Sequence, residues 1–285
     1  MNGKQGATNN RVLFGDPAEW EQFERRNPEF KTRIGNLVDT IRLAFRPFTV
    51  EEPIDKLLFH LVRLCAEDFS EILLLCGNGY GIGAEKLLRG MYERAVTATY
   101  LHNHPEETHN FLDYHAIANH KLMHATIATL DKDTFSAEQR QQIEGKFQEM
   151  KPKFMIADCK KCGTQRLNHT WTKVDLVTMA MNSGGLEKLL VPAYYMGVRE
   201  GHSTAGAIFS RLDVGAAQAD EGLIFDGSSQ PKRADMALLT AHKIILIVLE
   251  LHKNHFRLQF LEEPLQTCIA DLFAIWDKSE YAVGR

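Results

Sequence analysis

Apolar residues recur every three or four positions along most of the chain, which is the spacing of amphipathic α-helices. Two long segments with this spacing, 36–45 and 54–75, precede a cluster of glycines at 77–81. Further helical segments begin at residues that favour a helix start: Asp16-Pro17, Pro105, Ser136, Pro192, Pro231 and Pro264. The sequence shows no heptad series, internal repeat or strand of useful length. The pattern predicts an all-α fold, an irregular antiparallel bundle of about eight to ten helices.

The stretch from Gly81 to Tyr114 contains the clearest amphipathic helix. Its core-facing stripe consists of Ala84, Leu87, Leu88, Met91, Ala95 and Ala98. A second stripe on the far side contains Arg89, Glu93, Val96 and Tyr100. An arginine, a carboxylate and a phenol on one face can form a chemical site, or they can be a solvated face with an ordinary ion pair. Glu85 already stands in the favourable order for a surface pair with Arg89, so helix stabilisation does not require Glu93.

A second group of polar residues follows Pro192. If residues 193–212 form one helix, a single side carries Tyr195, Arg199, His202, Gly206 and Phe209, and Ser203 follows directly after the histidine. His202 fits either a buried hydrogen-bonding residue or a general acid-base group. Gly201 and Gly206 lower the helix propensity, which helix packing or a close ligand would explain.

Two further clusters contain residue types that bind metals. On the helix from Pro105, His120 and His124 lie one turn apart and in line with Asp113, an arrangement that suits either solvated histidines or a metal site. Cys159 and Cys162 form a Cys-x-x-Cys-Gly turn, which is how one half of a zinc ribbon is built. The second half is absent. His169 is a candidate third ligand, while a redox pair or an inert turn are alternatives.

Composition places the chain among ordinary globular proteins, with 44% hydrophobic and 25% charged residues. The net charge of −4 argues against coating of nucleic acid by the whole surface, and five dispersed cysteines do not suggest a disulfide framework. The polar first residues lack a secretory signal and no apolar run could span a membrane, so a cytoplasmic protein is expected. The apolar stretch 236–251 leaves room for a partner chain and hence a homo-oligomer.

The expected organisation is one helical domain at 15–277 between a flexible N-terminal tail at 1–14 and a C-terminal tail at 278–285. The least regular part, 131–171, contains the Cys-x-x-Cys turn and is expected to be an insert in that domain.

The segment LLRGMYERAVTATYL, the Pro-Glu-Glu helix start after it and the Tyr-His pair at 114–115 resemble a bacterial family catalogued only as a domain of unknown function (family 5677 type). Members share an Arg-x-x-x-Glu helix, a Trp after a basic segment, and a later helix with Tyr and a His-Ser pair. The resemblance spans 55–212 and marks Arg89, Glu93, Tyr100, Trp171, Tyr195, His202 and Ser203. It implies an all-helical fold and no established activity.

Helical bacterial proteins of the HEPN type are similar in organisation, and many are ribonucleases of phage defence. This similarity implies RNA as a substrate. The chain departs from their pattern, because no arginine stands four to six residues before a histidine; Arg199 and His202 have only two residues between them.

Three functions stay open from the sequence. In the first, Arg89 holds an anionic ligand or RNA, His202 moves a proton and Glu93 orients one of them, beside Arg199, Tyr195 and Ser203. In the second, the same side chains form a structural network in a binding or dimerising module. In the third, Cys159, Cys162 and His169 bind zinc as a regulatory element.

Overall fold

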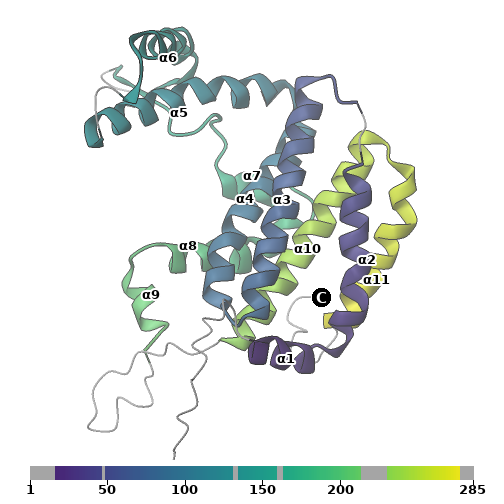
Figure 1. Cartoon of the computed structure of the whole chain (residues 1–285). Helices are drawn as coiled ribbons and strands as arrows, with labels where there is room; N and C mark the ends of the chain where they lie inside the picture. The colour runs from purple at the N-terminus through teal and green to yellow at the C-terminus, as the bar shows by residue number, and fades with distance from the viewer. Residues whose placement is uncertain (1–16, 47–48, 131–133, 159–162, 213–229, 277–285) are drawn as a thin grey trace, which may run out of the picture. The chain divides into compact units, whose positions relative to one another are not determined.

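The chain folds almost entirely into helices. The computed structural model describes residues 17–46, 49–130, 134–158, 163–212 and 230–276. Among these residues the only strands form one short two-stranded sheet, so the all-α prediction is confirmed (Figure 1). No helix in the described part of the chain is long and apolar enough to cross a membrane.

Two compact units make up the chain. Unit 1 consists of 1–48, 61–95 and 185–285, and unit 2 consists of 49–60 and 96–184. Helices α3 (Pro53–Gly77) and α4 (Gly81–Asn103) each contribute residues to both units. The boundaries expected for one domain stay a prediction, and the two predicted tails, 1–14 and 278–285, lie entirely outside the described residues.

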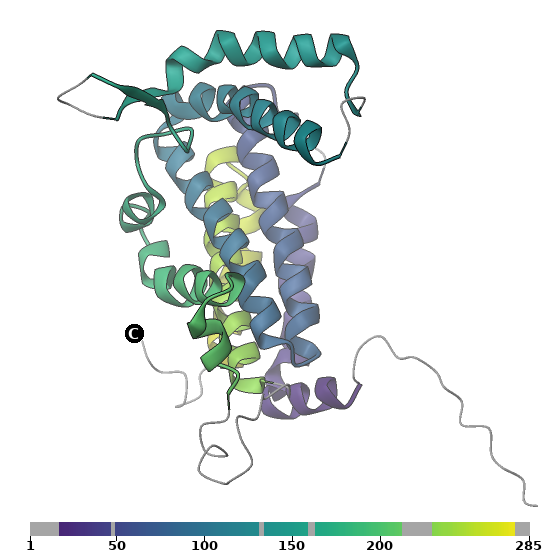
Figure 2. The same ribbon diagram turned by 90° about the vertical axis from the view of Figure 1, so that its left-hand side faces the viewer.

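Unit 1 is a helical bundle in which α2, α10 and α11 lie side by side (Figure 1), and Figure 2 shows α4 beside α3. Along the chain, short helical segments precede its last two long helices, α10 and α11. Besides parts of α3 and α4, its elements are α1 (Pro17–Arg26), α2 (Pro28–Ala44), η4 (Leu186–Leu189), η5 (Leu190–Tyr195), α8 (Met196–Gly201), α9 (Ala205–Phe209), α10 (Pro231–Phe256), η7 (Gln259–Leu261) and α11 (Glu262–Trp276).

Helix α10 supplies much of the core of unit 1. Pro231 lies in its first turn, where the missing N–H costs nothing, and Arg257 ends it in the left-handed conformation at φ 57°. Most side chains between these ends are buried, including Leu238, Ala241, Ile244, Ile245, Val248 and Leu249. Each buried Leu or Ile contributes about 1.5–3 kcal/mol, so this apolar stretch stabilises the unit as the sequence predicted.

Unit 2 is built around an antiparallel pair of helices. Its elements are η1 (Pro105–Glu107), α5 (Thr108–Thr129), α6 (Ala137–Met150), η3 (Lys151–Phe154), β1 (Met155–Ala157), β2 (Gln165–Leu167) and α7 (Leu176–Met181). Ser136, which was predicted to start a helix, forms a capping box with Gln139 at the start of α6. Ile117, Phe147 and Phe154 form the core between the helices.

The predicted continuous helix over residues 193–212 is wrong. A π-helical segment, η5, leads into α8, which ends at Gly201, and His202 is extended at φ −106° and ψ 152°. Thr204 then caps the separate helix α9 by accepting a hydrogen bond from the Ala207 N–H. Because the backbone leaves the helix at His202, the predicted alignment of Tyr195, Arg199 and His202 on one face does not form.

Candidate functional site

Arg89 lies in the middle of α4, where the sequence predicted a polar face opposite a buried stripe. Five of the six stripe residues are buried, and Leu87 is half-buried. The polar face is narrower than predicted, because Val96 is buried as well. The Arg89 Nε donates to Glu93 Oε1 at 2.8 Å, and the guanidinium lies 5.4 Å from the centre of the Tyr194 ring. The side chains of Arg89 and Glu93 are 31% and 39% exposed, so ligands in solvent can reach them.

His202 meets this pair from the extended segment after α8. Its Nε2 lies 3.2 Å from Arg89 Nη1. A guanidinium can only donate, so this hydrogen bond requires His202 to be neutral, with its proton on Nδ1 and a lone pair on Nε2. The structure thus brings together Arg89, Glu93 and His202, which are separated in sequence by as many as 113 positions.

A glycine allows the two segments to approach so closely. A Cβ at Gly197 in α8 would lie 2.6 Å from the carbonyl oxygen of Glu85 and 2.7 Å from the Cβ of Arg89. Both distances are too short for any side chain, so α8 can approach α4 this closely only because residue 197 is a glycine. Gly201, which the sequence singled out, has no neighbouring atom where a Cβ would stand. The close approach therefore depends on Gly197, a residue that sequence reasoning missed.

A buried ion network lies beside the contact between α4 and α8. Arg233 of α10 donates from Nε to Glu85 at 2.9 Å and from Nη2 to Glu200 at 2.9 Å. Arg199 donates to the same oxygen of Glu200 at 2.9 Å. Glu85 and Glu200 are both buried, and such carboxylates are stable only when paired. Burial of Glu200 opposes its charge, but the hydrogen bonds from Arg233 and Arg199 outweigh it and lower the pKa of that carboxyl.

The network corrects the expected pairing of Glu85. Its carboxylate bonds to Arg233, 148 positions away, and the exposed partner of Arg89 is Glu93 instead. One sequence signal indicated that Glu85 is buried: it directly follows Ala84 of the buried stripe and so lies at the edge of the face that packs on the core. Its partner could not be found this way, because periodicity within one helix says nothing about a residue on another.

The other predicted site residues lie elsewhere. Arg199 points to Glu200, and Tyr195 is 47% exposed with its ring 5.4 Å from that of Tyr194. Ser203 is exposed. Among the described residues, no hydrogen bond or ring contact joins Tyr195 or Ser203 to Arg89, Glu93 or His202. The site that the geometry assembles is therefore smaller than the predicted set.

Unit 2 contains the two remaining residues marked by the family resemblance. The ring of Trp171 lies 5.8 Å from that of Tyr100 and 5.2 Å from that of Phe111, both in edge-to-face arrangements. Burial raises the pKa of Tyr100, which keeps its phenol protonated at neutral pH. A cavity of about 340 Å³ adjoins Trp171 and is also lined by Lys153 and Asn168. This aromatic cluster anchors the loop after β2.

The predicted zinc ligands are only partly within the described residues. Cys159 and Cys162 lie outside them, and His169 is exposed. The other three cysteines, Cys65, Cys76 and Cys268, are free and buried, and burial raises the pKa of each thiol. They are inert core residues.

Comparison with known proteins gives one match. A family described as a family of unknown function (DUF5677) matches residues 55–219. No curated protein and no solved structure matches the chain. The family match covers more than half of the 285 residues and includes both the Arg89 and the Trp171 clusters.

Proposed function

The chain belongs to the family of unknown function DUF5677, and because that membership assigns no activity, we propose a function from the site itself. Arg89 and His202 bind an anionic group of an extended ligand, and RNA is the substrate to test. The observation that carries this proposal is the 3.2 Å contact between Arg89 Nη1 and His202 Nε2 at an exposed position.

Arg89 is suited to hold a phosphate. Its Nε is oriented by Glu93, and its planar fork still has N–H groups beyond those used by Glu93 and His202. Nη1 has two N–H groups, and a phosphate oxygen that accepts from the one bonded to His202 displaces the imidazole from it. Binding of the anion therefore leaves the Nε2 lone pair of His202 available to accept a proton.

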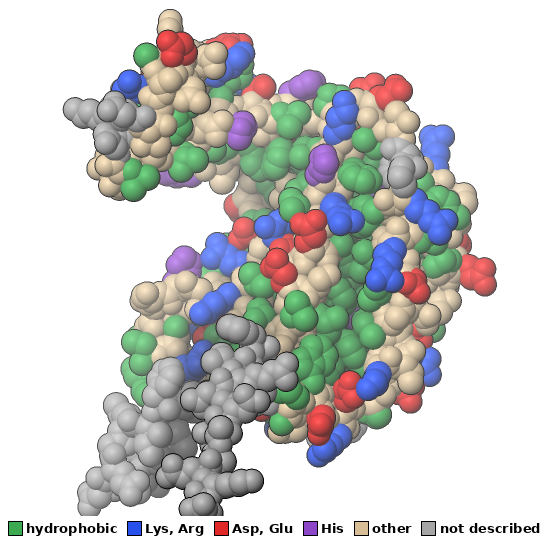
Figure 3. All heavy atoms as spheres, viewed as in Figure 1, with side chains coloured by type: hydrophobic (Ala, Val, Ile, Leu, Met, Phe, Trp, Pro, Cys, Tyr) green, Lys and Arg blue, Asp and Glu red, His purple; other side chains and the backbone are tan. Residues whose placement is uncertain are grey.

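The surroundings favour a polymer over a small enclosed substrate. Blue (Lys or Arg) and purple (His) side chains lie on the surface over α8 and α9 (Figure 3), and the basic residues of segment 196–209 are Arg199 and His202. Tyr195 and Arg199 are exposed there, and an exposed phenol ring can stack on an unpaired base. In RNA cleavage, His202 would take the proton from a 2′-hydroxyl as its oxygen attacks phosphorus, and the P–O5′ bond would break to give a 2′,3′-cyclic phosphate. The departing 5′-oxygen would take a proton from water, while Arg89 balances the charge on the phosphate.

The direct test is degradation of total cellular RNA by the purified protein, with and without divalent metal. Arg89→Ala and His202→Ala are expected to lose cleavage while keeping the wild-type melting temperature. Arg63→Ala is a matched control, since Arg63 also pairs with a glutamate four residues later and lies 5.2 Å from an aromatic ring, that of Phe45. Equal cleavage by Arg89→Ala and Arg63→Ala would contradict the proposal.

A second candidate is a non-catalytic binding or dimerisation module whose polar network is structural. The observation in its favour is charge balance: three arginines, Arg89, Arg199 and Arg233, are paired with three carboxylates, Glu93, Glu200 and Glu85. A network of this kind fixes the register between helices. In that case Arg89→Ala and His202→Ala would lower the melting temperature, and the wild-type protein would leave RNA intact.

Zinc binding through Cys159, Cys162 and His169 remains a third candidate, supported by the Cys-x-x-Cys-Gly pattern alone. Metal analysis of the purified protein beside Cys159→Ser/Cys162→Ser tests it. An equal number of zinc equivalents in the wild-type protein and in the double variant would contradict a site at these cysteines.

A further inference from the structure

Two histidines of α5 and one glutamate of α6 bring their ligand atoms together in unit 2. His120 Nε2 lies 3.0 Å from Glu144 Oε2 and 3.1 Å from His124 Nε2. The three ligand atoms all lie within 4.8 Å of one another. The sequence had placed the histidines in line with Asp113, but that carboxylate pairs with Lys153 at 2.7 Å. The carboxylate that meets the histidines comes from the neighbouring helix.

Hydrogen bonding cannot account for both short contacts of His120 Nε2. The Nε2 of an imidazole has one bonding direction in the ring plane, in which it either donates a proton or accepts one. His120 Nε2 has two partners in this direction, Glu144 and His124, so at most one of them can have a straight hydrogen bond. A cation placed among the three atoms would instead bond to each of them.

We propose that His120, His124 and Glu144 bind one Zn²⁺ ion. Two imidazole nitrogens and one carboxylate oxygen are a donor set that zinc accepts, whereas Mg²⁺ and Ca²⁺ prefer oxygen ligands alone. Zn–N bonds of about 2.0–2.1 Å at tetrahedral angles separate two ligand atoms by about 3.3 Å. The observed 3.0 and 3.1 Å need to widen by only a few tenths of an ångström.

The side chains around the cluster hold two of the ligands in place. The His120 ring is stacked on Phe147, with ring centres 3.6 Å apart and planes inclined by 8°. Gln148 donates to Glu144 Oε1 at 2.7 Å, which leaves Oε2 directed to His120. Outer contacts of this type orient the ligands in metal sites. The His124 side chain is exposed and that of Glu144 is 47% exposed, so the fourth coordination position of the ion is open to water or to a group from another molecule.

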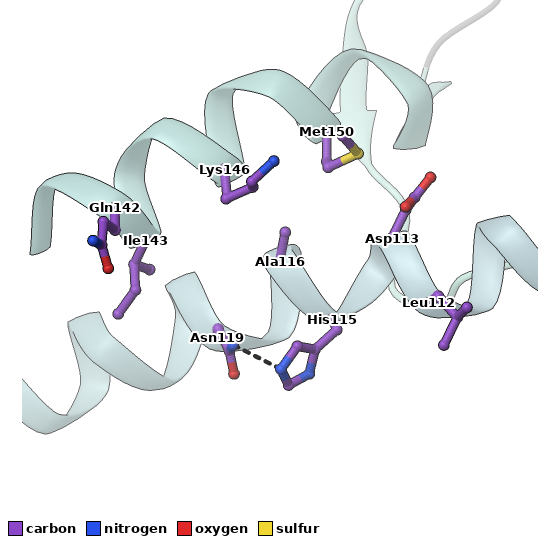
Figure 4. A pocket seen from close by; sticks show the side chains of 9 residues that line it. All are labelled: Leu112, Asp113, His115, Ala116, Asn119, Gln142, Ile143, Lys146 and Met150. Atoms are coloured by element: carbon purple, nitrogen blue, oxygen red, sulfur yellow. Dashed lines mark hydrogen bonds between the residues drawn. The ribbon is translucent and has the colours of Figure 1, made fainter. Parts of the chain in front are cut away.

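The same helix pair offers a matched control. His115 is an exposed histidine of α5 that bonds Asn119 at 2.8 Å. Figure 4 shows both side chains pointing away from α6, beside a cavity of about 330 Å³ that Ile143 and Lys146 help to line. His115 has the same chemistry as His124 but no carboxylate from α6, so its removal should not affect zinc.

The experiment measures Zn²⁺ affinity of the untagged full-length protein by competition with a chromophoric chelator. All variants carry Cys159→Ser/Cys162→Ser, so that thiolates cannot contribute. We expect about one equivalent of Zn²⁺ to bind, and His124→Ala and Glu144→Gln each to weaken binding by at least about tenfold, the lower end of the effect of losing even an outer contact. His115→Ala should bind as the parent does.

Two further measurements keep the result independent of folding. Metal-free melting curves should coincide for Glu144→Gln, His124→Ala and the parent, because both residues are partly or fully exposed. Bound Co²⁺ should give the weak visible bands of nitrogen and oxygen ligands without thiolate absorption. If the parent with both cysteines replaced binds no Zn²⁺, or if Glu144→Gln and His124→Ala bind it as tightly as His115→Ala, the proposal is wrong.

Discussion

Unit 1 contains two Arg-x-x-x-Glu pairs that look alike locally and differ in what packs beside them. Arg63 and Glu67 of α3 are 3.2 Å apart, and Arg89 and Glu93 of α4 are 2.8 Å apart. Each arginine also lies over an aromatic ring, that of Phe45 for Arg63 and that of Tyr194 for Arg89. The two pairs therefore share the same spacing along the helix and the same type of aromatic neighbour.

The difference arises from a distant segment. Gly197 lets α8 approach the backbone of α4, and the chain then leaves the helix so that His202 reaches Arg89. Arg63 has no histidine within hydrogen-bonding distance among the described residues. A short charged motif can therefore form a binding or catalytic site only where a tertiary contact brings a further functional group beside it.

The largest expected effect concerns the buried network that accompanies only the Arg89 pair. Arg233→Ala leaves Glu85 and Glu200 buried without their shared cation, which should cost about 3–5 kcal/mol of unfolding free energy. Arg63→Ala removes an exposed pair and should cost about 0–1 kcal/mol. Urea denaturation measures both. Equal midpoints for the two variants would show that the network does not distinguish these regions.

Acid stability tests the buried core of unit 1, which contains two histidines, rather than the exposed pairs at its surface. Burial lowers the pKa of His242 to about 4, and Asp271 opposes this only in part. The unfolded chain therefore binds more protons between about pH 6.5 and 4, so stability is full above this window and is lost as the pH falls through it. His242 should account for about 3 kcal/mol of that loss.

The measurement is the unfolding free energy from pH 7 to pH 4. His242→Gln, whose amide oxygen can still accept from Trp276 Nε1, should flatten the curve, although the similarly buried His252 keeps part of the slope. A slope that His242→Gln leaves unchanged would contradict the burial of a neutral imidazole at this position.

The approach of α8 can be tested at two glycines. Gly197→Ala places a Cβ against the Glu85 carbonyl, which should cost about 1–3 kcal/mol and separate His202 from Arg89. Gly201→Ala meets open space and should change the unfolding free energy by no more than about 1 kcal/mol in the stabilising direction. Thermal melting compares the two. If Gly197→Ala leaves the melting temperature unchanged, α4 and α8 are not in close contact.

The smallest expected effect is on stability at the paired arginines themselves. Arg89→Ala and Arg63→Ala should each change the unfolding free energy by about 0–1 kcal/mol, since both pairs are exposed or half-exposed. If the two variants are equally stable, any difference between them in RNA binding or cleavage arises from the site and not from unfolding. A much larger loss for Arg89→Ala would favour the structural interpretation of the network.

Local patterns gave the helices reliably. The stripe of α4, the capping box of α6 and the apolar run of α10 are all determined by residues within a few turns of one another. The tertiary features were not accessible in this way. Periodicity continued smoothly through residues 193–212, whereas the break at His202 depends on the cap at Thr204 and on packing against α4.

The candidate site was half predicted for the same reason. Arg89, Glu93 and His202 were singled out by residue type and by the family resemblance, and the structure brings them together. Arg199 was added on the assumption of one helix, and Tyr195 on that assumption and on the family resemblance; the break removes the shared helix face. Glu85 and Arg233 were missed because their pairing spans 148 positions.

The most direct test of the central claim is a double-mutant cycle on affinity for a single-stranded RNA at fixed salt. Arg89→Ala and His202→Ala should be coupled by about 0.5–3 kcal/mol if both hold one phosphate. The matching cycle of Arg63→Ala with His202→Ala should be additive within about 0.5 kcal/mol. Additive losses in both cycles, or no RNA binding by the wild-type protein, would contradict a shared anion site at Arg89 and His202.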